Sequence, residues 1–387
     1  MGRWFNWDIV SKSLLVLFSL VVSLAACEVA LRTFAPIWQR YYFTWPPGLR
    51  QPFNPDPAVL PGVRGPAPFA INADGIRGDP FSPRQRYRIL AIGGSTTECA
   101  YLDSAEAWPH LLQDDLNRAL GRPVVWVGNL GRSGNTTRCS RLQVRDLVPS
   151  YPRIDAIVLL VGVNDLQFRL MDGDHFQPYR QVAAMYDPTM KPFFKRTEIW
   201  RRLHLLKTDV RQRLRHELLT LDESGHRMIL ARRQRRAARR VLRDLPDLTS
   251  ALEEYVENIH AIVDAARARH LRAVFLTQPA LWSPGLPRGL DSLLWFGRAT
   301  LEGEGSRDYY SVEALAAGME RYNDALRATC RSRGVECIDL AAMLPRDTTV
   351  FYDDCHFNES GARKVAAILT DYFTRSGALS GVALRAR

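Results

Sequence analysis

The sequence predicts an α/β fold in which a parallel β-sheet carries helices on both faces. Short apolar runs of strand length recur along the 387 residues, and the run at residues 156–161 is apolar throughout, as in a strand buried on both faces. Between these runs lie stretches with leucines at helical spacing, for example in residues 106–120. Strands that alternate with helices in this way form parallel sheets.

The predicted elements follow one another in strand–helix order. Strands are expected at residues 87–94, 124–130, 156–161, 273–277 and 335–340. Helices are expected at residues 106–120, in the stretch that ends near residue 147, and at residues 253–270, 314–332 and 359–373. Ligands of such sheets bind outside the carboxyl ends of the strands, so the chemistry is expected in the segments that follow the strands.

An apolar run at residues 9–26 precedes this pattern, so residues 1–35 are expected to form a membrane anchor or a signal. Its 18 residues are at the short end of what crosses a bilayer. Besides an uncleaved anchor, three interpretations stay open: a buried core helix, a cleaved secretion signal, and a lipoprotein signal, since residues 24–27 resemble a lipobox ending at Cys27. Proline blocks helices and central strands, so the Pro-rich residues 36–84 are expected to be an extended linker over the domain.

The net charge of +11 comes from one segment. Residues 191–245 hold 17 Lys and Arg against 6 Asp and Glu, and 17 − 6 = 11, so the rest of the chain is neutral. A solvated helical face and contact with anionic lipid both fit this segment. Nucleic acid is not an expected partner, because the aromatic interleaving of a single-strand binder is missing. The six cysteines form no CxxC pair, which argues against a structural zinc site.

Polar clusters follow the predicted strands at four equivalent positions. They contain Ser95 after the first strand, Gly134 after the second, Asn164 after the third, and Asp353 with His356 after the fifth. Each alone has an ordinary explanation, since Ser95 could cap a helix and Asn164 could occupy a turn. A phosphate-binding loop would also explain the glycines before Ser95, but no lysine follows Ser95 before the next helix.

Taken together, the clusters indicate a nucleophilic hydrolase. A serine hydroxyl such as that of Ser95 needs a base to take its proton. His356 is the candidate base, and Asp353, three residues earlier, is the candidate that orients its ring and stabilises the imidazolium. Asp354 is the alternative orienter. The expected oxyanion donors are the backbone N–H groups of Ser95 and Gly134 and the side-chain amide of Asn164.

At these residues the sequence resembles the SGNH hydrolases, also called the GDSL family of esterases and lipases. Four signature blocks are matched in order. Ser95 matches the nucleophile, Gly134 and Asn164 match the second and third blocks, and Asp353 with His356 matches the D-x-x-H block. The sequence departs from the family's Gly-Asp-Ser at one position, where Gly94 replaces the aspartate. This Gly-Gly-Ser-Thr form is typical of membrane-anchored bacterial members.

The resemblance implies a three-layer αβα sandwich of the flavodoxin-like type with a five-stranded parallel sheet. It would occupy residues 85–380, with insertions at about 166–250 and 282–313. The resemblance also implies that the protein needs no metal or other cofactor. The second insertion contains five aromatic residues that either wall a substrate pocket or pack as a small lid. They are Trp282, Trp295, Phe296, Tyr309 and Tyr310.

The expected function is a membrane-anchored serine esterase or O-acyl hydrolase that cleaves an acyl ester of an envelope glycan or a lipid through an acyl-enzyme. Its catalytic domain is expected in the periplasm or otherwise outside the cytoplasm, because an apolar segment and a spacer precede it. An O-acyltransferase acting on a cell-surface polysaccharide would use the same site and is the first alternative. A non-catalytic glycan-binding scaffold is the second, and the intact serine, histidine and aspartate argue against it.

Overall fold

The computed structural model describes residues 7–34, 42–204, 206, 225–299, 308–377 and 379. Contacts divide the chain into two compact units. The small unit comprises Met1–Tyr41 and Ala183–Thr220, and the large unit comprises Tyr42–Val182 and Leu221–Arg387. Parts of the expected anchor, of the linker, of both insertions and of the C-terminal end of the expected domain lie outside the described residues.

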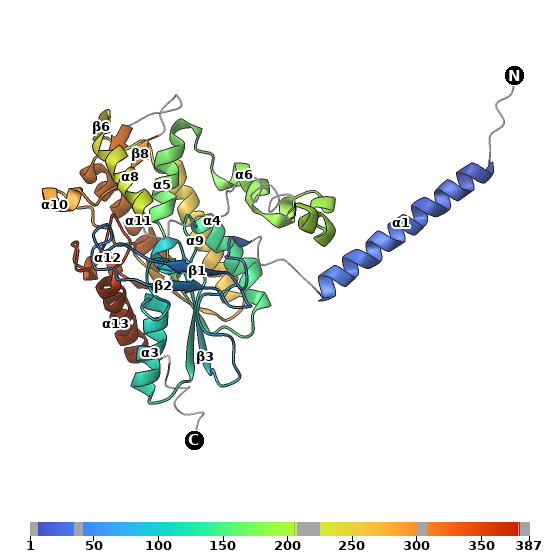
Figure 1. Cartoon of the computed structure of the whole chain (residues 1–387), viewed down its shortest axis with the longest axis horizontal. Helices are drawn as coiled ribbons and strands as arrows, with labels where there is room; N and C mark the ends of the chain where they lie inside the picture. The colour runs from blue at the N-terminus through green and yellow to red at the C-terminus, as the bar shows by residue number, and fades with distance from the viewer. Residues whose placement is uncertain are drawn as a thin grey trace. The chain divides into compact units, whose positions relative to one another are not determined.

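A five-stranded parallel sheet forms the centre of the large unit (Figure 1). Its strands are β3 (Tyr87–Gly93), β4 (Val125–Asn129), β5 (Ala156–Leu160), β7 (Arg272–Leu276) and β10 (Glu336–Ile338). They lie in the order β10-β7-β5-β3-β4 with all neighbours parallel, which is the flavodoxin-like order. Every residue of β5 is buried, which explains its apolar sequence. The predicted five-stranded parallel sheet is confirmed.

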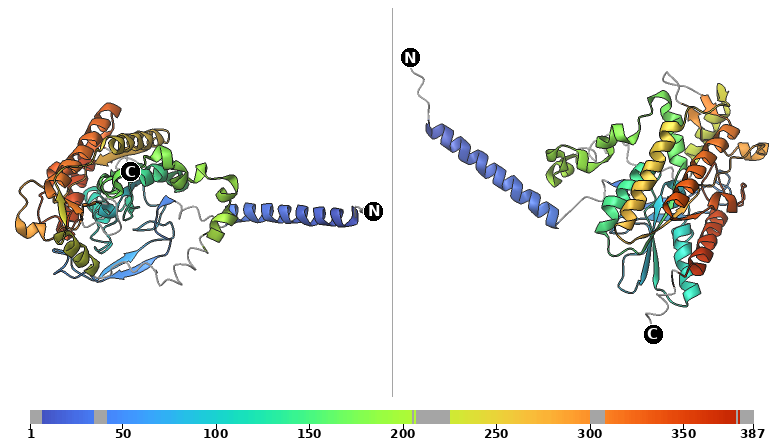
Figure 2. Two further views of the ribbon diagram at one scale, coloured as in Figure 1. Left: turned by 90° about the horizontal axis from the view of Figure 1, so that it is seen from above. Right: turned by 180° about the vertical axis from the view of Figure 1, so that it is seen from behind.

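Helices cover both faces of this sheet and complete three layers. On one face, α3 (Trp108–Leu120) packs against α13 (Glu359–Arg375) (Figure 1). On the other face, α9 (Thr249–Arg267) packs against α11 (Val312–Arg333) and α4 (Thr137–Leu142) (Figure 2). The apolar stripes of these helices are buried, as the helical spacing of the leucines in α3 predicts.

Several predicted strands and helices are a residue or more longer than the observed elements, and two of these differences have a clear cause. The helix predicted to reach residue 270 ends at Arg267, because the chain turns through His270, whose φ is 54°, to enter β7. The strand predicted to reach residue 340 ends at Ile338, because Leu340 begins the short helix α12 (Leu340–Met343). Both differences arise from turns that apolar periodicity does not indicate.

The Pro-rich segment packs on the large unit through a small core of its own. Strands β1 (Arg50–Phe53) and β2 (Ala67–Ala70) form an antiparallel pair, and Trp45, Phe53 and Phe69 are buried with them. The segment is also bonded to the loops after β4. Arg132 donates to the carbonyl of Thr44 at 2.7 Å, and Gln143 donates to that of Tyr42 at 2.8 Å. The expected extended segment over the domain therefore contains a short hairpin.

The two insertions meet in a second small sheet. The first supplies α8 (His226–Arg236) and β6 (Arg240–Leu242), and the second supplies α10 (Arg288–Asp291), β8 (Arg298–Ala299) and β9 (Asp308–Tyr310). Strand β9 pairs with β6 on one side and with β8 on the other. Two further helices, α5 (Val163–Asp172) and α6 (Tyr179–Tyr186), precede these elements. The sequence analysis did not predict this small sheet, because pairing between segments so far apart in sequence has no local sequence pattern.

The basic helix α8 turns two of its arginines inward. Arg232 is buried and donates to the carbonyls of Val59 at 2.7 Å and Tyr352 at 3.0 Å. Arg235 donates to the carbonyl of Tyr310 at 3.1 Å. These two side chains therefore bind loops of the large unit together, and part of the positive charge of this insertion serves its own packing.

The small unit contains the N-terminal helix α1 (Trp7–Phe34). Its stretch Ser11–Phe34 contains an 18-residue window with a mean hydropathy of 2.5, is long and apolar enough to cross a membrane, and has no buried residue in that window. A signal sequence near the N-terminus would meet the same criteria. The helix extends beyond the apolar run at residues 9–26, through Glu28 and Arg32, which are bonded to each other at 2.6 Å.

Candidate active site

Strand β3 brings Ser95 to the carboxyl edge of the sheet. The strand ends at Gly93, and Ser95 is the first residue of the short helix α2 (Ser95–Glu98). Gly94 has no room for a side chain, because a Cβ there would lie 2.3 Å from Nδ2 of Asn164. The glycine that replaces the family's aspartate therefore allows the loop after β5 to approach the Ser95 turn closely.

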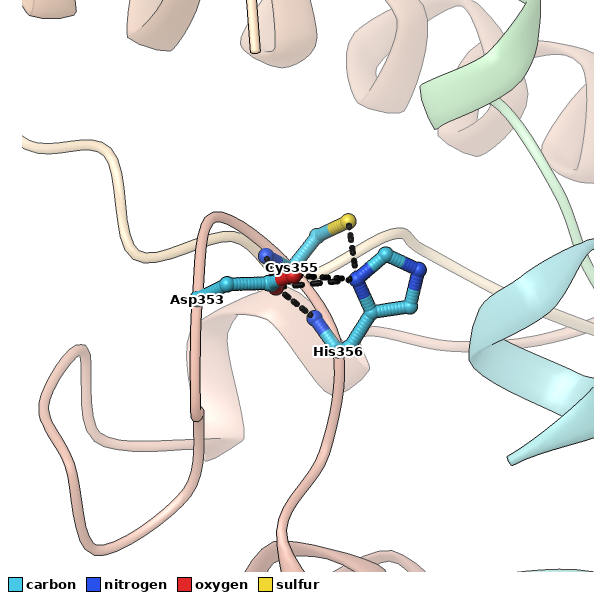
Figure 3. A group of neighbouring side chains, drawn as sticks. All are labelled: Asp353, Cys355 and His356. Carbon is cyan, nitrogen blue, oxygen red and sulfur yellow. Dashed lines mark hydrogen bonds and ion pairs between the residues drawn. The ribbon is translucent and has the colours of Figure 1, made fainter. Parts of the chain in front are cut away.

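Ser95, His356 and Asp353 form one chain of hydrogen bonds. Ser95 Oγ lies 2.7 Å from His356 Nε2. His356 Nδ1 lies 2.8 Å from Asp353 Oδ2 and 2.9 Å from Oδ1, and Figure 3 shows this edge of the ring facing the carboxylate. Asp353 also accepts from the backbone N–H groups of Cys355 at 3.0 Å and His356 at 2.9 Å. One short loop thus fixes both the ring and its carboxylate.

Burial and charge act in opposite directions on this pair. Asp353 is fully buried. Burial raises the pKa of Asp353, but the charge of His356 and the hydrogen bonds to the carboxylate outweigh it and hold that pKa below its usual range. Burial lowers the pKa of His356, but the Asp353 carboxylate outweighs this and holds it well above its usual range. The carboxylate therefore stabilises the charge that the imidazole acquires on taking a proton.

The rings of two aromatic side chains lie nearly parallel to the His356 ring. Tyr352 lies 5.5 Å from it with an interplanar angle of 8°, and Trp295 lies 6.3 Å from it with an angle of 6°. Trp295 Nε1 also donates to Asp353 Oδ2 at 2.9 Å. The sequence analysis placed Trp295 in a pocket wall or lid and missed this bond, which joins residues 58 apart in sequence.

Asp354, the alternative orienter, faces away from His356 toward the second insertion. Its carboxylate accepts from Trp282 Nε1 at 2.8 Å and from the backbone N–H groups of Trp295 at 2.8 Å and Phe296 at 3.3 Å. Burial, and then the charge of Asp353, raises the pKa of Asp354 to about 6. The geometry therefore pairs His356 with Asp353 and leaves Asp354 to hold the aromatic loop.

The three expected oxyanion donors border the same cavity as His356. Ser95, Gly134 and Asn164 all line it. Asn164 Nδ2 donates to the carbonyl of Asn135 at 2.8 Å, so the block-two loop fixes the orientation of this amide. Gly134 has a φ of +82°, a conformation that strongly favours glycine. All the predicted site residues are therefore at this edge of the sheet, with Asp353 buried behind His356.

Glu98 is a buried residue of the site that the sequence analysis missed. Its carboxylate accepts from the indole of Trp45 and from the hydroxyl and backbone N–H of Ser133, the last at 3.0 Å. Arg77 donates to the carbonyls of Glu98 at 2.5 Å and Cys99 at 2.7 Å. Burial raises the pKa of Glu98, against the effect of the hydrogen bonds from Ser133 and Trp45. Glu98 thus joins the Ser95 helix, the block-two loop and the Pro-rich segment.

Asp353, Cys355 and His356 bring three potential metal-ligand atoms within 4.8 Å of one another (Figure 3). The imidazole Nδ1 among them is already bonded to the carboxylate. Burial raises the pKa of the Cys355 thiol to about 11, whereas metals bind the thiolate. These three residues fit a hydrogen-bonded relay better than a metal site.

The candidate active-site cavity has a volume of about 340 Å³ and is lined by apolar side chains as well as by Ser95 and His356. Phe168 and Met171 come from α5, Met228 comes from α8, and Phe296 comes from the second insertion. Both insertions therefore contribute to the cavity. Of the two interpretations of the aromatic loop, Trp295 and Phe296 fit the pocket wall, while Trp282 is fully buried.

The three-layer fold, with a serine, a histidine and an aspartate at the carboxyl edge of its sheet, has the architecture of the αβα hydrolases. The model of the GDSL-like lipase/acylhydrolase family matches residues 91–364, so the chain belongs to this family and is an ester-hydrolysing enzyme. The predicted family, fold and enzyme class are confirmed. The catalytic roles of the individual site residues stay predictions.

Similar solved structures include LAE5, an α/β hydrolase from the metagenome of Lake Arreo, with 16% identity, coverage of 74% of this chain and 95% of that chain, and a TM-score of 0.40. A G-D-S-L family lipolytic protein from Veillonella parvula has 11% identity, coverage of 75% and 99%, and a TM-score of 0.40. The acetylxylan esterase Axe2 from Geobacillus stearothermophilus has 13% identity, coverage of 75% and 94%, and a TM-score of 0.38. No curated protein matches the chain significantly in sequence.

Proposed function

We propose that the protein is a serine esterase or O-acyl hydrolase in which Ser95 is the nucleophile, His356 the general base and Asp353 its orienting carboxylate. The observation that carries this proposal is the 2.7 Å contact between Ser95 Oγ and His356 Nε2. A hydroxyl held by an imidazole, which is in turn held by a buried carboxylate, can lose its proton as it attacks a carbonyl.

The proposed reaction proceeds through an acyl-enzyme. Ser95 Oγ attacks the ester carbonyl carbon while its proton passes to His356 Nε2. The tetrahedral oxyanion is stabilised by the backbone N–H groups of Ser95 and Gly134 and by the amide of Asn164. Collapse expels the alcohol, which takes the proton from His356. Water then attacks the acyl carbon, with His356 again as base, and frees the acid and Ser95.

The cavity wall supports an acyl group as the part of the substrate that is buried. Tyr101, Phe168, Met171, Met228 and Phe296 supply apolar or aromatic surface to the cavity that Ser95 borders. Burying apolar acyl surface there is favourable by about 25 cal/mol per Å². The substrate class that we propose is an acyl ester of an envelope glycan or of a lipid.

The proposal includes an uncleaved membrane anchor formed by α1, with the large unit in the periplasm or otherwise outside the cytoplasm. Support comes from the length and hydropathy of Ser11–Phe34. The expected contact of residues 191–245 with anionic lipid belongs to the same proposal. Protease added to intact spheroplasts should digest the large unit, and digestion only after lysis would place that unit in the cytoplasm.

The catalytic proposal is tested by hydrolysis of p-nitrophenyl acetate with Ser95→Ala. The expected loss is on the order of 10⁶-fold for a fully competent site. Ser292→Ala is the matched control, because Ser292 is exposed in the second insertion and its hydroxyl donates to the nearby carbonyl of Gly289. A polysaccharide acceptor included in the assay separates the two reaction types, because an acyltransferase would acylate sugar hydroxyls faster than water. Unchanged hydrolysis by Ser95→Ala would refute the assignment.

A further inference from the structure

The second part of the small unit exposes an apolar surface that the catalytic proposal does not use. Six large apolar side chains in residues 190–206 are between 41% and 76% exposed. They are Met190, Phe193, Phe194, Trp200, Leu203 and Leu206. Phe194 and Trp200 contact each other edge to face at 5.3 Å, so two of the aromatic rings form one exposed cluster. We call residues 190–204 and 206 the interfacial segment.

The interfacial segment is bonded to helix α1. The Glu28 carboxylate accepts from the backbone N–H of Glu198 at 2.8 Å and from that of Ile199 at 3.1 Å. Arg32 donates to the same carboxylate at 2.6 Å. Glu198 itself is buried and pairs with Arg201 at 2.8 Å. These bonds fix the segment at the level of Glu28 along the helix.

The position of Glu28 along α1 determines the depth of the segment. Ser11 and Glu28 are 17 residues apart, which at 1.5 Å per residue is about 26 Å of helix. The hydrocarbon core of a bilayer is about 30 Å thick. If α1 crosses the membrane from Ser11, Glu28 and the backbone at residues 198 and 199 lie where the hydrocarbon meets the lipid headgroups.

The composition of the segment matches that depth. It contains five basic residues, Lys191, Lys195, Arg196, Arg201 and Arg202, against the single acidic residue Glu198. Aromatic and leucine side chains beside Lys and Arg are the composition of peptide segments that lie in the interface of an anionic bilayer. The other strongly basic part of this insertion fits less well, because Arg232 and Arg235 of α8 are bonded inside the large unit.

We propose that the interfacial segment binds the anionic phospholipid surface beside the point where α1 leaves the bilayer. Phe193, Phe194, Trp200 and Leu203 would insert at the headgroup level. Lys191, Lys195 and Arg196 would pair with lipid phosphates, while Arg201 stays paired with Glu198. The proposal rests on the membrane anchor of the proposed function. It narrows the lipid contact proposed for residues 191–245 to the interfacial segment, which lies within the Ala183–Thr220 part of the small unit.

Photocrosslinking of the full chain in vesicles of phosphatidylethanolamine and phosphatidylglycerol tests this proposal. The photoreactive residue p-benzoylphenylalanine replaces Phe193 in one variant, Leu17 of α1 in a second, and Val241 of β6 in a third. Leu17 and Val241 are 57% and 61% exposed, so they report the anchor and a matched exposed site of the large unit. Mass analysis after irradiation identifies lipid adducts, and retained ester hydrolysis shows that the large unit of each variant is folded.

We expect lipid adducts at positions 193 and 17, each at least about tenfold above position 241. With neutral phosphatidylcholine vesicles, the yield at position 193 should fall by about fivefold or more while the yield at position 17 stays unchanged. If lipid adducts form at position 17 but the yield at position 193 is no higher than that at position 241, this inference is overturned and the anchor stands. Background yields at both 17 and 193 would refute the anchor as well. A crosslink from 193 to a second protein chain, or equal yields in neutral and anionic vesicles, would also overturn it.

Discussion

The indole of Trp295 donates a 2.9 Å hydrogen bond to Asp353, the carboxylate that holds His356. The same indole is stacked at 6° to the His356 ring. A loop of the second insertion is therefore connected to the chemistry both by a hydrogen bond and by a ring contact. We therefore propose that Trp295 is a positioning residue, which would act on the reaction through Asp353 and His356.

Trp295→Phe should lower kcat by about tenfold, because a hydrogen bond to a charged group contributes about 1.5 kcal/mol or more. It should also move the acid limb of the pH profile to higher pH, because the carboxylate then interacts more strongly with the imidazolium. Trp282→Phe is the matched control, since its indole donates to Asp354 instead. An equal shift of the acid limb in both variants would show that the loop acts only through stability.

The pH dependence of kcat/KM reports His356 directly. The neutral imidazole is the base, so activity should be lost as the pH falls through the pKa of His356, and this limb should lie above the usual value of 6.5. Asp353→Asn removes the charge that holds this pKa up, so the limb should move to lower pH while kcat falls by about 10⁴-fold. Steady-state rates from pH 5 to 9 measure both effects. If the acid limb of Asp353→Asn lies at the same pH as that of the unchanged protein, the limb does not report the pKa of His356 held up by Asp353.

Asn164→Ala should slow turnover by about 10²–10³-fold without unfolding the protein, as expected for the loss of one oxyanion donor. Gly94→Ala should slow turnover by a similar factor, because its Cβ would lie 2.3 Å from Asn164 Nδ2. The double variant should be no slower than the worse single variant, since both changes act on one amide. Gly289→Ala, at a position with nothing within 4 Å of the added Cβ, controls for the substitution. If the rate reduction in the double variant equals the product of the two single reductions, the two substitutions do not act on the same amide.

Glu98→Gln should destabilise the large unit by about 1–3 kcal/mol. Whichever way the amide is turned, its NH2 group faces a donor, either the backbone N–H of Ser133 or the indole N–H of Trp45. The loop that contains Gly134 should loosen with it, so kcat should fall along with the midpoint of denaturant unfolding. Hydrogen exchange of residues 131–136 measures the loosening. If the variant is less stable but hydrogen exchange of residues 131–136 is unchanged, Glu98 stabilises the Pro-rich segment and not the loop that contains Gly134.

Much of this architecture could be predicted because its signals are local. Buried parallel strands are apolar throughout, as in residues 156–161, and their carboxyl ends meet at one edge. This rule is why Ser95, Asn164 and His356 could be expected at one place before any coordinates were known. Ser95 and His356 are hydrogen-bonded and all three residues line one cavity, which agrees with that expectation. Their catalytic roles await the kinetics.

The rest depends on contacts between distant residues, which one sequence does not reveal. Glu98 looks like an ordinary helix residue until Trp45 and Ser133 are seen to bond to it. The parallel pairing of β6 with β9 joins residues 68 apart, as at Arg240 and Asp308. Similarly, the attachment of residues 198 and 199 to Glu28 crosses 170 positions or more of sequence.

The most direct test of the central claim is peptide mass analysis after the full chain reacts with a fluorophosphonate, which labels serines activated by a neighbouring base. We expect one phosphonyl group on the peptide that contains Ser95, no label on that peptide in Ser95→Ala, and labelling slowed by about 10³-fold or more in His356→Ala. Labelling of another serine, or an undiminished rate in His356→Ala, would contradict the claim that His356 activates Ser95.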